Sequence, residues 1–171
     1  MKLIGIVCII AGSTGVGMSC AQDLELRIAE LLQIRQWVIL LKGELRYMHQ
    51  PLPEAFLHLS EKAASPFREF FVKVGEDMVS RKGQSAENIW KQHLGTCVSG
   101  LHMTGKEIKE LEKLGNVLGY LDVEMQINAL DYYLEQLELS STEAQEASRS
   151  RRKLYQYMGI LGGVALSILI F

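Results

Sequence analysis

Two long segments without any charged side chain constrain this sequence more than any other feature. Residues 3–21 contain no Asp, Glu, Lys or Arg, and neither do residues 154–171. A helix of about 18 residues is about 27 Å long, close to the roughly 30 Å hydrocarbon core of a bilayer. We therefore expect a transmembrane helix over residues 1–21 and another over residues 154–171, with a separate domain between them.

Small residues in both segments recur at the spacing of one helix face. Small side chains let the backbones of membrane helices approach closely, so these positions are expected to pack against other helices. They are Gly15 and Ser19 in the first segment, and Gly159, Gly163 and Ser167 in the second.

The first segment also contains a near-match to a phosphate-binding loop. Residues 10–19 read IAGSTGVGMS. Gly12, Gly17 and Ser19 are spaced as in G-x-x-x-x-G-K-[ST], but Met18 replaces the lysine that reaches the phosphates. The chain also lacks the alternation of strands and helices that would supply a parallel sheet, so a dinucleotide-binding loop fails too. We interpret these glycines as part of a helix and predict no nucleotide site.

A cleaved signal peptide is the alternative interpretation of the first segment. Lys2 precedes an apolar stretch, and the sequence GMSC ending at Cys20 resembles a lipoprotein cleavage site. The branched aliphatic residue that usually stands three positions before such a cysteine is absent, so a retained helix is preferred.

Charge beside the second segment predicts the orientation of the chain. The sequence RSRRK at residues 149–153 directly precedes that segment, and basic residues flanking a membrane helix tend to stay in the cytoplasm. Lys2 argues for the opposite orientation, but it is a single charge. We therefore expect residues 22–153 in the cytosol. This region holds 17 of the 18 basic and all 20 acidic residues, a balance that does not favour nucleic-acid binding.

The central region is predicted to be all-α, a compact cytosolic bundle of about six helices over residues 22–139. Apolar residues recur every three or four positions from Leu24 to Met48, and the prolines at 51 and 53 end that helix. Thr104 and Glu107 form a capping box further along the chain. The apolar stripe ends at Leu139, so residues 140–153 are expected to form an exposed polar stalk.

Residues that could carry chemistry are few and have structural explanations. His93 and Cys97 have metal-ligand spacing, but no second such pair exists, so both are predicted to pack in the core. Asp122 is expected to cap a helix and to share an i,i+4 hydrogen bond with Gln126. No nucleophile has an identifiable base. We therefore predict no enzymatic activity, cofactor, metal or small-molecule substrate.

Three stretches resemble the stage III sporulation protein AB family. They are LKGELRYMHQPLPEAF at residues 41–56, WKQHL at 90–94 and LGNVLGYLDVEMQINAL at 114–130, and the resemblance extends over both apolar segments. The patterns E-x-x-Y-x-x-x-P-L-x-E-A and L-G-x-x-D-x-x-x-Q carry most of it. The matching positions are Glu44, Tyr47, Pro51, Leu52, Glu54, Ala55, Leu118, Gly119, Asp122 and Gln126.

This resemblance implies a non-enzymatic platform subunit, because the family is similar to the platform protein of type II secretion and type IV pilus systems. It implies a place in the channel complex between mother cell and forespore, on the mother-cell side of the outer forespore membrane. The implied partners are the secretion-type ATPase, stage III sporulation protein AA, and other stage III sporulation channel subunits. Secretion platforms carry two bundles and three membrane helices, so this chain either self-associates as a homo-oligomer or requires another subunit.

Two alternatives remain open in the sequence. The chain could be a non-enzymatic membrane-anchored adaptor or signalling subunit outside secretion. At the proline turn, a structural role competes with a docking role. In the structural interpretation, which we favour, Glu54 stabilises the first turn of its helix and Tyr47 packs on the bundle. In the docking interpretation, the turn exposes Glu54 and its neighbours to a basic face on a partner.

Overall fold

The computed structural model describes the backbone of residues 2–80, 83–119 and 122–170, and within it the side chains of residues 22–150 and of Leu154. These residues form six helices and no strand, which confirms the all-α prediction. The helices are α1 (Lys2–Tyr47), α2 (Leu52–Lys62), α3 (Phe67–Val79), α4 (Ala86–Val98), α5 (Gly105–Leu118) and α6 (Val123–Ile170).

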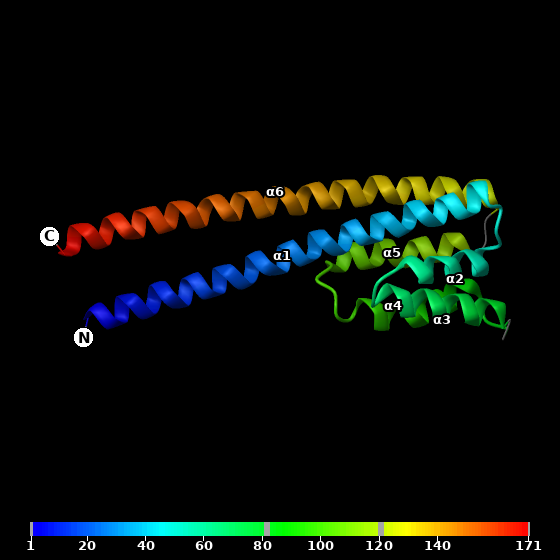
Figure 1. Cartoon of the computed structure of the whole chain (residues 1–171), viewed down its shortest axis with the longest axis horizontal. Coiled ribbons are helices and arrows are strands. Elements are labelled where there is room, and N and C mark those ends of the chain that lie inside the picture. Colours follow the sequence, from blue (N-terminus) through cyan, green and yellow to red (C-terminus); the bar gives the residue numbers. More distant parts are fainter. Residues whose placement is uncertain (1, 81–82, 120–121, 171) are drawn as a thin grey trace.

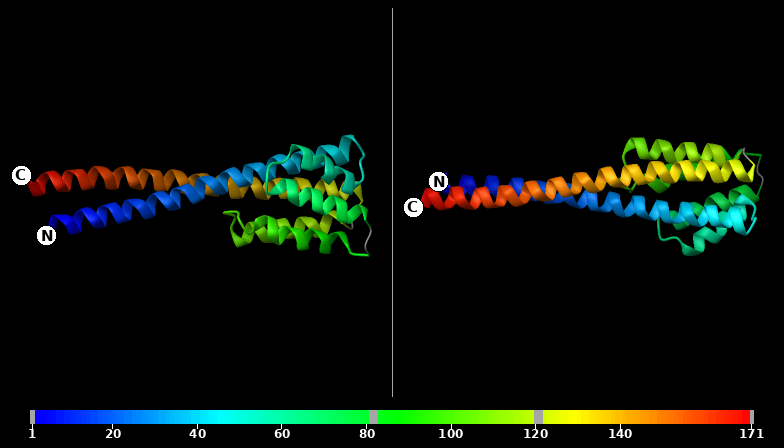
Figure 2. Two further views of the ribbon diagram at one scale, coloured as in Figure 1. Left: turned by 60° about the horizontal axis from the view of Figure 1, so that its bottom comes forward. Right: turned by 90° about the horizontal axis from the view of Figure 1, so that it is seen from above.

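Two long antiparallel helices, α1 and α6, set the shape of the molecule. They run side by side, and the four shorter helices pack against the half that is distant from the chain ends (Figure 1). Both termini therefore lie at one end of the molecule, and the turns α1–α2, α3–α4 and α5–α6 lie at the other. The same arrangement is visible from two further directions (Figure 2).

The helix boundaries do not coincide with the predicted divisions, because α1 and α6 run through them without a break. Residues 10–19 belong to α1, as the helical interpretation of the glycine-rich stretch predicted. The predicted membrane segments, 1–21 and 154–171, lie outside the described side chains apart from Leu154, and so do Gly15, Ser19, Gly159, Gly163 and Ser167. Within the described part of the chain, no helix has a stretch long and apolar enough to cross a membrane.

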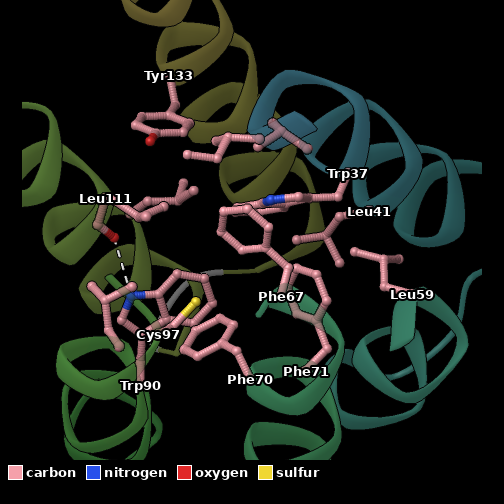
Figure 3. Close-up of a cluster of buried hydrophobic side chains, with 14 of the residues drawn as sticks. Trp37, Leu41, Leu59, Phe67, Phe70, Phe71, Trp90, Cys97, Leu111 and Tyr133 are labelled. Atoms are coloured by element: carbon pink, nitrogen blue, oxygen red, sulfur yellow. Dashed lines mark hydrogen bonds between the residues drawn. The ribbon is translucent and has the colours of Figure 1, made fainter. Parts of the chain in front are cut away.

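The core of the bundle is a cluster of aromatic side chains between α1, α3 and α4. Trp37 meets Phe71 edge-on with ring centroids 5.0 Å apart, and Phe70 meets Trp90 in the same way at 4.9 Å (Figure 3). The indole nitrogen of Trp90 donates to the carbonyl oxygen of Leu111 at 3.0 Å. Edge-to-face pairs and a satisfied indole group stabilise a core beyond the burial of its area, so this cluster fixes how the short helices sit on α1.

The apolar stripe predicted on α1 is confirmed over most of its length. Its positions from Leu31 to Leu45 are almost fully buried. Met48, however, is 62% exposed and does not belong to the core. The helix ends at Tyr47 and His49 has a positive φ of 50°, so the chain turns away before Met48 can complete the stripe.

The exposed stalk predicted for residues 140–153 is wrong at two positions. Ser141 is 7% exposed and Ala144 is fully buried, although most of their described neighbours face solvent. Here α6 continues along α1, and short side chains suffice to fill the narrow space between two close helices. The hydrophobic pattern missed this contact because no large apolar residue marks it.

Ion pairs fasten the end of the bundle that lies nearest the termini. Glu30 on α1 accepts hydrogen bonds from the backbone nitrogen of His102 at 2.7 Å and from its ring nitrogen Nδ1 at 2.9 Å. The Asp23 carboxylate lies 3.9 Å from the other ring nitrogen. These contacts hold the α4–α5 connection against α1.

This connection is expected to loosen as the pH rises. The hydrogen bond to Glu30 raises the pKa of His102, burial opposes the rise, and the charges of Glu30 and Asp23 add to it. A raised pKa means that the stabilisation is complete below about pH 6.5, the unfolded value, and is lost as the pH rises through the folded value. Hydrogen exchange of residues 99–104, corrected for its intrinsic pH dependence, should show greater protection at pH 5.5 than at pH 8.5. As a control, a His102→Gln variant should show equal protection at pH 5.5 and at pH 8.5. If the wild type also showed equal protection at the two pH values, the contact between His102 and Glu30 would not hold this connection.

Candidate functional site at the distal end of the bundle

The two sequence motifs lie in turns at the same end of the molecule, opposite the termini (Figure 1). A groove of about 360 Å³ opens between them. Its described lining includes Leu52 from the first motif and Leu118, Gly119 and Gln126 from the second, together with residues from α3, α4 and the α3–α4 loop. Segments that are more than 60 residues apart in the sequence therefore form one surface feature.

The first motif builds the turn that enters α2. Pro51 occupies the N-cap position with extended backbone angles of −55° and 146°, and its carbonyl oxygen accepts from the backbone nitrogen of Ala55 at 3.0 Å. Ala55 is completely buried and Leu52 is half-buried at the groove. A proline in the first turn loses no hydrogen bond there, so Pro51 and Pro53 start α2 at a fixed position.

The second motif closes α5 and opens α6. Asp122 accepts from the backbone nitrogen of Met125 at 2.9 Å, which confirms the predicted cap. The predicted bond between Asp122 and Gln126 is wrong, because the Gln126 amide nitrogen instead donates to the carbonyl oxygen of Leu118 at 2.9 Å. This hydrogen bond gives the Leu118 carbonyl a donor that the end of a helix otherwise lacks. Asp122 could not supply one, because an ionised carboxylate only accepts hydrogen bonds.

Gly119 has a steric role that the sequence did not show. A Cβ atom at this position would lie 2.7 Å from the Cβ of Ala86 at the start of α4. The glycine therefore allows the α5–α6 turn to approach α4 closely and form one wall of the groove.

Glu44 couples α1 to α2. The residue is only 9% exposed, and its carboxylate oxygens lie 3.5 Å from Nζ of Lys62 and 3.6 Å from Nδ1 of His58. One of its oxygens has no hydrogen-bond partner among the described residues. Glu44 therefore orients the turn from within the protein and is not a surface contact.

Tyr47 and Glu54 are the motif residues that the described structure does not use internally. The predicted packing of Tyr47 on the bundle is wrong, because its side chain is 76% exposed in the last turn of α1. Glu54 is exposed in the first turn of α2. Neither makes a side-chain hydrogen bond or ion pair within the described residues. The proline turn thus presents an aromatic ring and a carboxylate to solvent.

Cys97 packs in the core, as predicted, but His93 is only partly buried and does not belong to the core cluster. Nε2 of His93 lies 2.8 Å from a carboxylate oxygen of Asp77, and Cys97 is 6% exposed in the core. Burial raises the pKa of the Cys97 thiol to about 12, so it is protonated and unreactive at neutral pH. Within the described residues, no three metal-ligating side chains lie close enough together to hold an ion.

The three segments that meet at this end carry a small net negative charge when they are counted together. Residues 46–54, 76–87 and 116–126 together contain six Asp or Glu and three Lys or Arg. The groove therefore opens among segments whose sequences contain an excess of acidic over basic residues.

Comparison with known proteins assigns the chain to a family. The family model for stage III sporulation protein AB matches residues 2–171. The chain is 28% identical over 170 residues to stage III sporulation protein AB of Bacillus subtilis strain 168, covering 99% of each sequence. A solved structure of a stage III sporulation protein AB covers 72% of this chain and 97% of its own, with 26% identity and a TM-score of 0.65. The chain therefore belongs to the stage III sporulation protein AB family.

Proposed function

We propose that this protein is a membrane-anchored, non-enzymatic platform subunit of a secretion-like channel between mother cell and forespore. In this role it couples a cytosolic ATPase to the membrane complex at the outer forespore membrane, on the mother-cell side. One observation carries the proposal: a groove lined by residues of both family motifs lies at the end of the bundle farthest from both apolar segments.

The layout suits transmission of a mechanical change along the molecule. A helix of 46 residues is about 69 Å long, and α1 and α6 are both of about this length. A partner that binds the distal turns contacts the ends of both long helices at once. Displacement of those ends is carried to residues 1–21 and 154–171, because each helix continues into its apolar segment without a break.

The partner that we propose for the distal end is the secretion-type ATPase, stage III sporulation protein AA. The ATPase supplies the nucleotide chemistry, and this chain supplies the docking surface. Tyr47 and Glu54 are exposed on the two sides of the proline turn, and Leu52 and Pro53 of that turn line the groove. Aromatic side chains are enriched among the residues that contribute most to the affinity of protein interfaces.

Removing the exposed side chains at this turn is expected to weaken ATPase binding without unfolding the protein. Tyr47→Ala should lower the affinity by roughly tenfold or more, because buried tyrosines often contribute over 1 kcal/mol to an interface. Glu54→Gln should lower the affinity less and reduce its dependence on salt. Capture of the purified ATPase by the full-length protein in detergent, at several salt concentrations, measures both effects.

Glu61→Gln is the matched control, because Glu61 is another exposed carboxylate on α2 and is not part of either motif. Thermal unfolding should change by a few degrees at most in all three variants. Equal ATPase capture by all variants would remove this turn from the docking surface. Co-purification of a sensor kinase or regulator, and no ATPase, would favour the adaptor role.

A further inference from the structure

A line of exposed apolar side chains runs along α6 on its outer face. Met125 is 52% exposed, Tyr132 is 61% exposed and Leu139 is 59% exposed. Each is seven residues from the next, so all three lie on one side of the helix. Single exposed apolar residues are normal on a protein surface, but three at seven-residue spacing form one apolar line along the helix.

Opposite charges flank this line on its two sides. α6 lies between α5 and α1 when the outer face is viewed directly (Figure 2, right). On the α5 side are three exposed lysines, Lys106, Lys109 and Lys113, of which Lys113 pairs with Glu110 of the same helix at 2.7 Å. The α1 side of α6 is marked by the ion pair between Asp131 and Lys42. The exposed carboxylates of Glu135 and Glu138 lie beside Asp131 on the helix surface. We call this whole surface the α5–α6 face.

We propose that the α5–α6 face binds a second copy of this chain, with the two copies related by a two-fold axis parallel to α6. The parallel direction rests on the proposed function, in which both copies are anchored in one membrane by the same end. Such an axis exchanges the two flanks. The lysines of one copy then face the glutamates of the other, while Tyr132 and Leu139 meet their own counterparts at the centre.

The opposite arrangement is disfavoured by the same charges. If the two faces met with their helices antiparallel, each flank would face the same flank of the other copy. The lysines of one copy would then lie opposite the lysines of the other. Like charges at an interface reduce affinity, so the charge pattern selects the parallel dimer. Flanking charges set partner orientation in coiled coils in the same way.

Lengthwise register adds a specific pair. α5 and α6 pack against each other, and Lys106 lines a small pocket with Gln136, Leu137 and Ser140, so it lies at the level of Glu138 and Leu139. Because a parallel two-fold axis keeps each level unchanged, Glu138 of one copy faces Lys106 of its partner.

The experiment uses full-length protein in detergent. Lys106→Glu should raise the dimer dissociation constant by tenfold or more, as measured by light scattering over a range of concentrations. Adding Glu138→Lys to this variant should restore dimerisation, because the pair is then reversed and not broken. Lys73→Glu, at an exposed lysine on α3, is the matched control and should leave the dimer intact.

Disulfide cross-linking tests the direction of the two copies. In a background without the three native cysteines, Leu139→Cys should form a cross-linked dimer with itself and Val79→Cys, at an exposed position off the face, should not. The proposal would be overturned if the protein were monomeric at every concentration, or if the double variant did not regain dimerisation. It would also be overturned if cross-links formed only between Met125→Cys and Leu139→Cys. ATPase capture by the same proteins is a separate measurement. If the full-length protein forms no dimer but still captures the ATPase, only the dimer proposal is rejected and the proposed function is retained.

Discussion

Replacing Gly115 with alanine is expected to destabilise the protein by about 3 kcal/mol, the upper end of the usual cost of overpacking a core. A Cβ atom on Gly115 would lie 2.1 Å from two ring atoms of Trp90. Trp90 is fully buried, packs against Phe56 and Phe70, and is held by its hydrogen bond to Leu111. The ring has no free space to enter, so α5 must move away from α4. For a chain of this size, the melting temperature should fall by roughly 6–12 °C.

Gly95→Ala provides the control for intrinsic helix propensity. Gly95 is an exposed glycine inside α4, and an added Cβ there would meet no atom within 4 Å. The alanine should stabilise the protein by about 0.4–1 kcal/mol, because it reduces the freedom of the unfolded chain without strain. Thermal unfolding followed by circular dichroism measures both variants. A Gly115→Ala protein as stable as the wild type would show that α4 and α5 do not approach each other as closely as the structure indicates.

Gly115 illustrates where sequence patterns stop being informative. Thr104 and Glu107 correctly predict where the helix that contains Gly115 begins. A glycine within a helical pattern, however, argues against a helix, and it does not indicate that Gly115 contacts Trp90, 25 positions earlier. Close approach between two helices depends on the tertiary arrangement, which no local pattern encodes.

The distal site was predictable from the sequence only in its local features. The proline turn and the Asp122 cap have local signatures, and both are confirmed. The exposure of Tyr47 was predicted wrongly, although Tyr47 lies off the apolar stripe of α1, which steps from Leu45 to Met48. The meeting of the two motifs at one groove arises from the antiparallel course of α1 and α6, which became apparent only with the fold.

Glu107 shows how a correctly predicted local contact can conceal a larger one. Its capping box with Thr104 is present, with the carboxylate accepting from the Thr104 backbone nitrogen at 2.7 Å. The same carboxylate binds Arg27 of α1, 80 positions earlier, through Nη2 at 2.7 Å and through Nε at 3.2 Å. Glu107 is 4% exposed and Arg27 is 18% exposed. This pair joins α5 to α1, and nothing in the local sequence indicates it.

Glu107→Gln is therefore expected to destabilise the protein by roughly 3 kcal/mol at neutral pH. A glutamine keeps the size of the side chain and can still accept from Thr104, but it leaves the Arg27 charge without its partner in a largely buried position. Breaking a buried ion pair from one side costs about 3–5 kcal/mol, and the residual exposure of Arg27 favours the lower end. Glu110→Gln is the control on the same helix, because Glu110 pairs with the exposed Lys113 and should contribute at most about 0.5 kcal/mol.

The pH dependence of this effect identifies the ion pair as its cause. Burial would raise the pKa of Glu107, but the hydrogen bonds from Arg27 and Thr104 and the charge of Arg27 outweigh it, so the pKa lies below its usual value. A carboxylate with a lowered pKa contributes its full stabilisation above its unfolded value of about 4.3 and loses it as the pH falls through the folded value. The difference in unfolding free energy between wild type and Glu107→Gln should therefore be largest near pH 7 and shrink as the solution is acidified below pH 4. A difference that stays constant across this range would mean that the loss comes from packing, and that the charge of Glu107 does not hold α5 to α1.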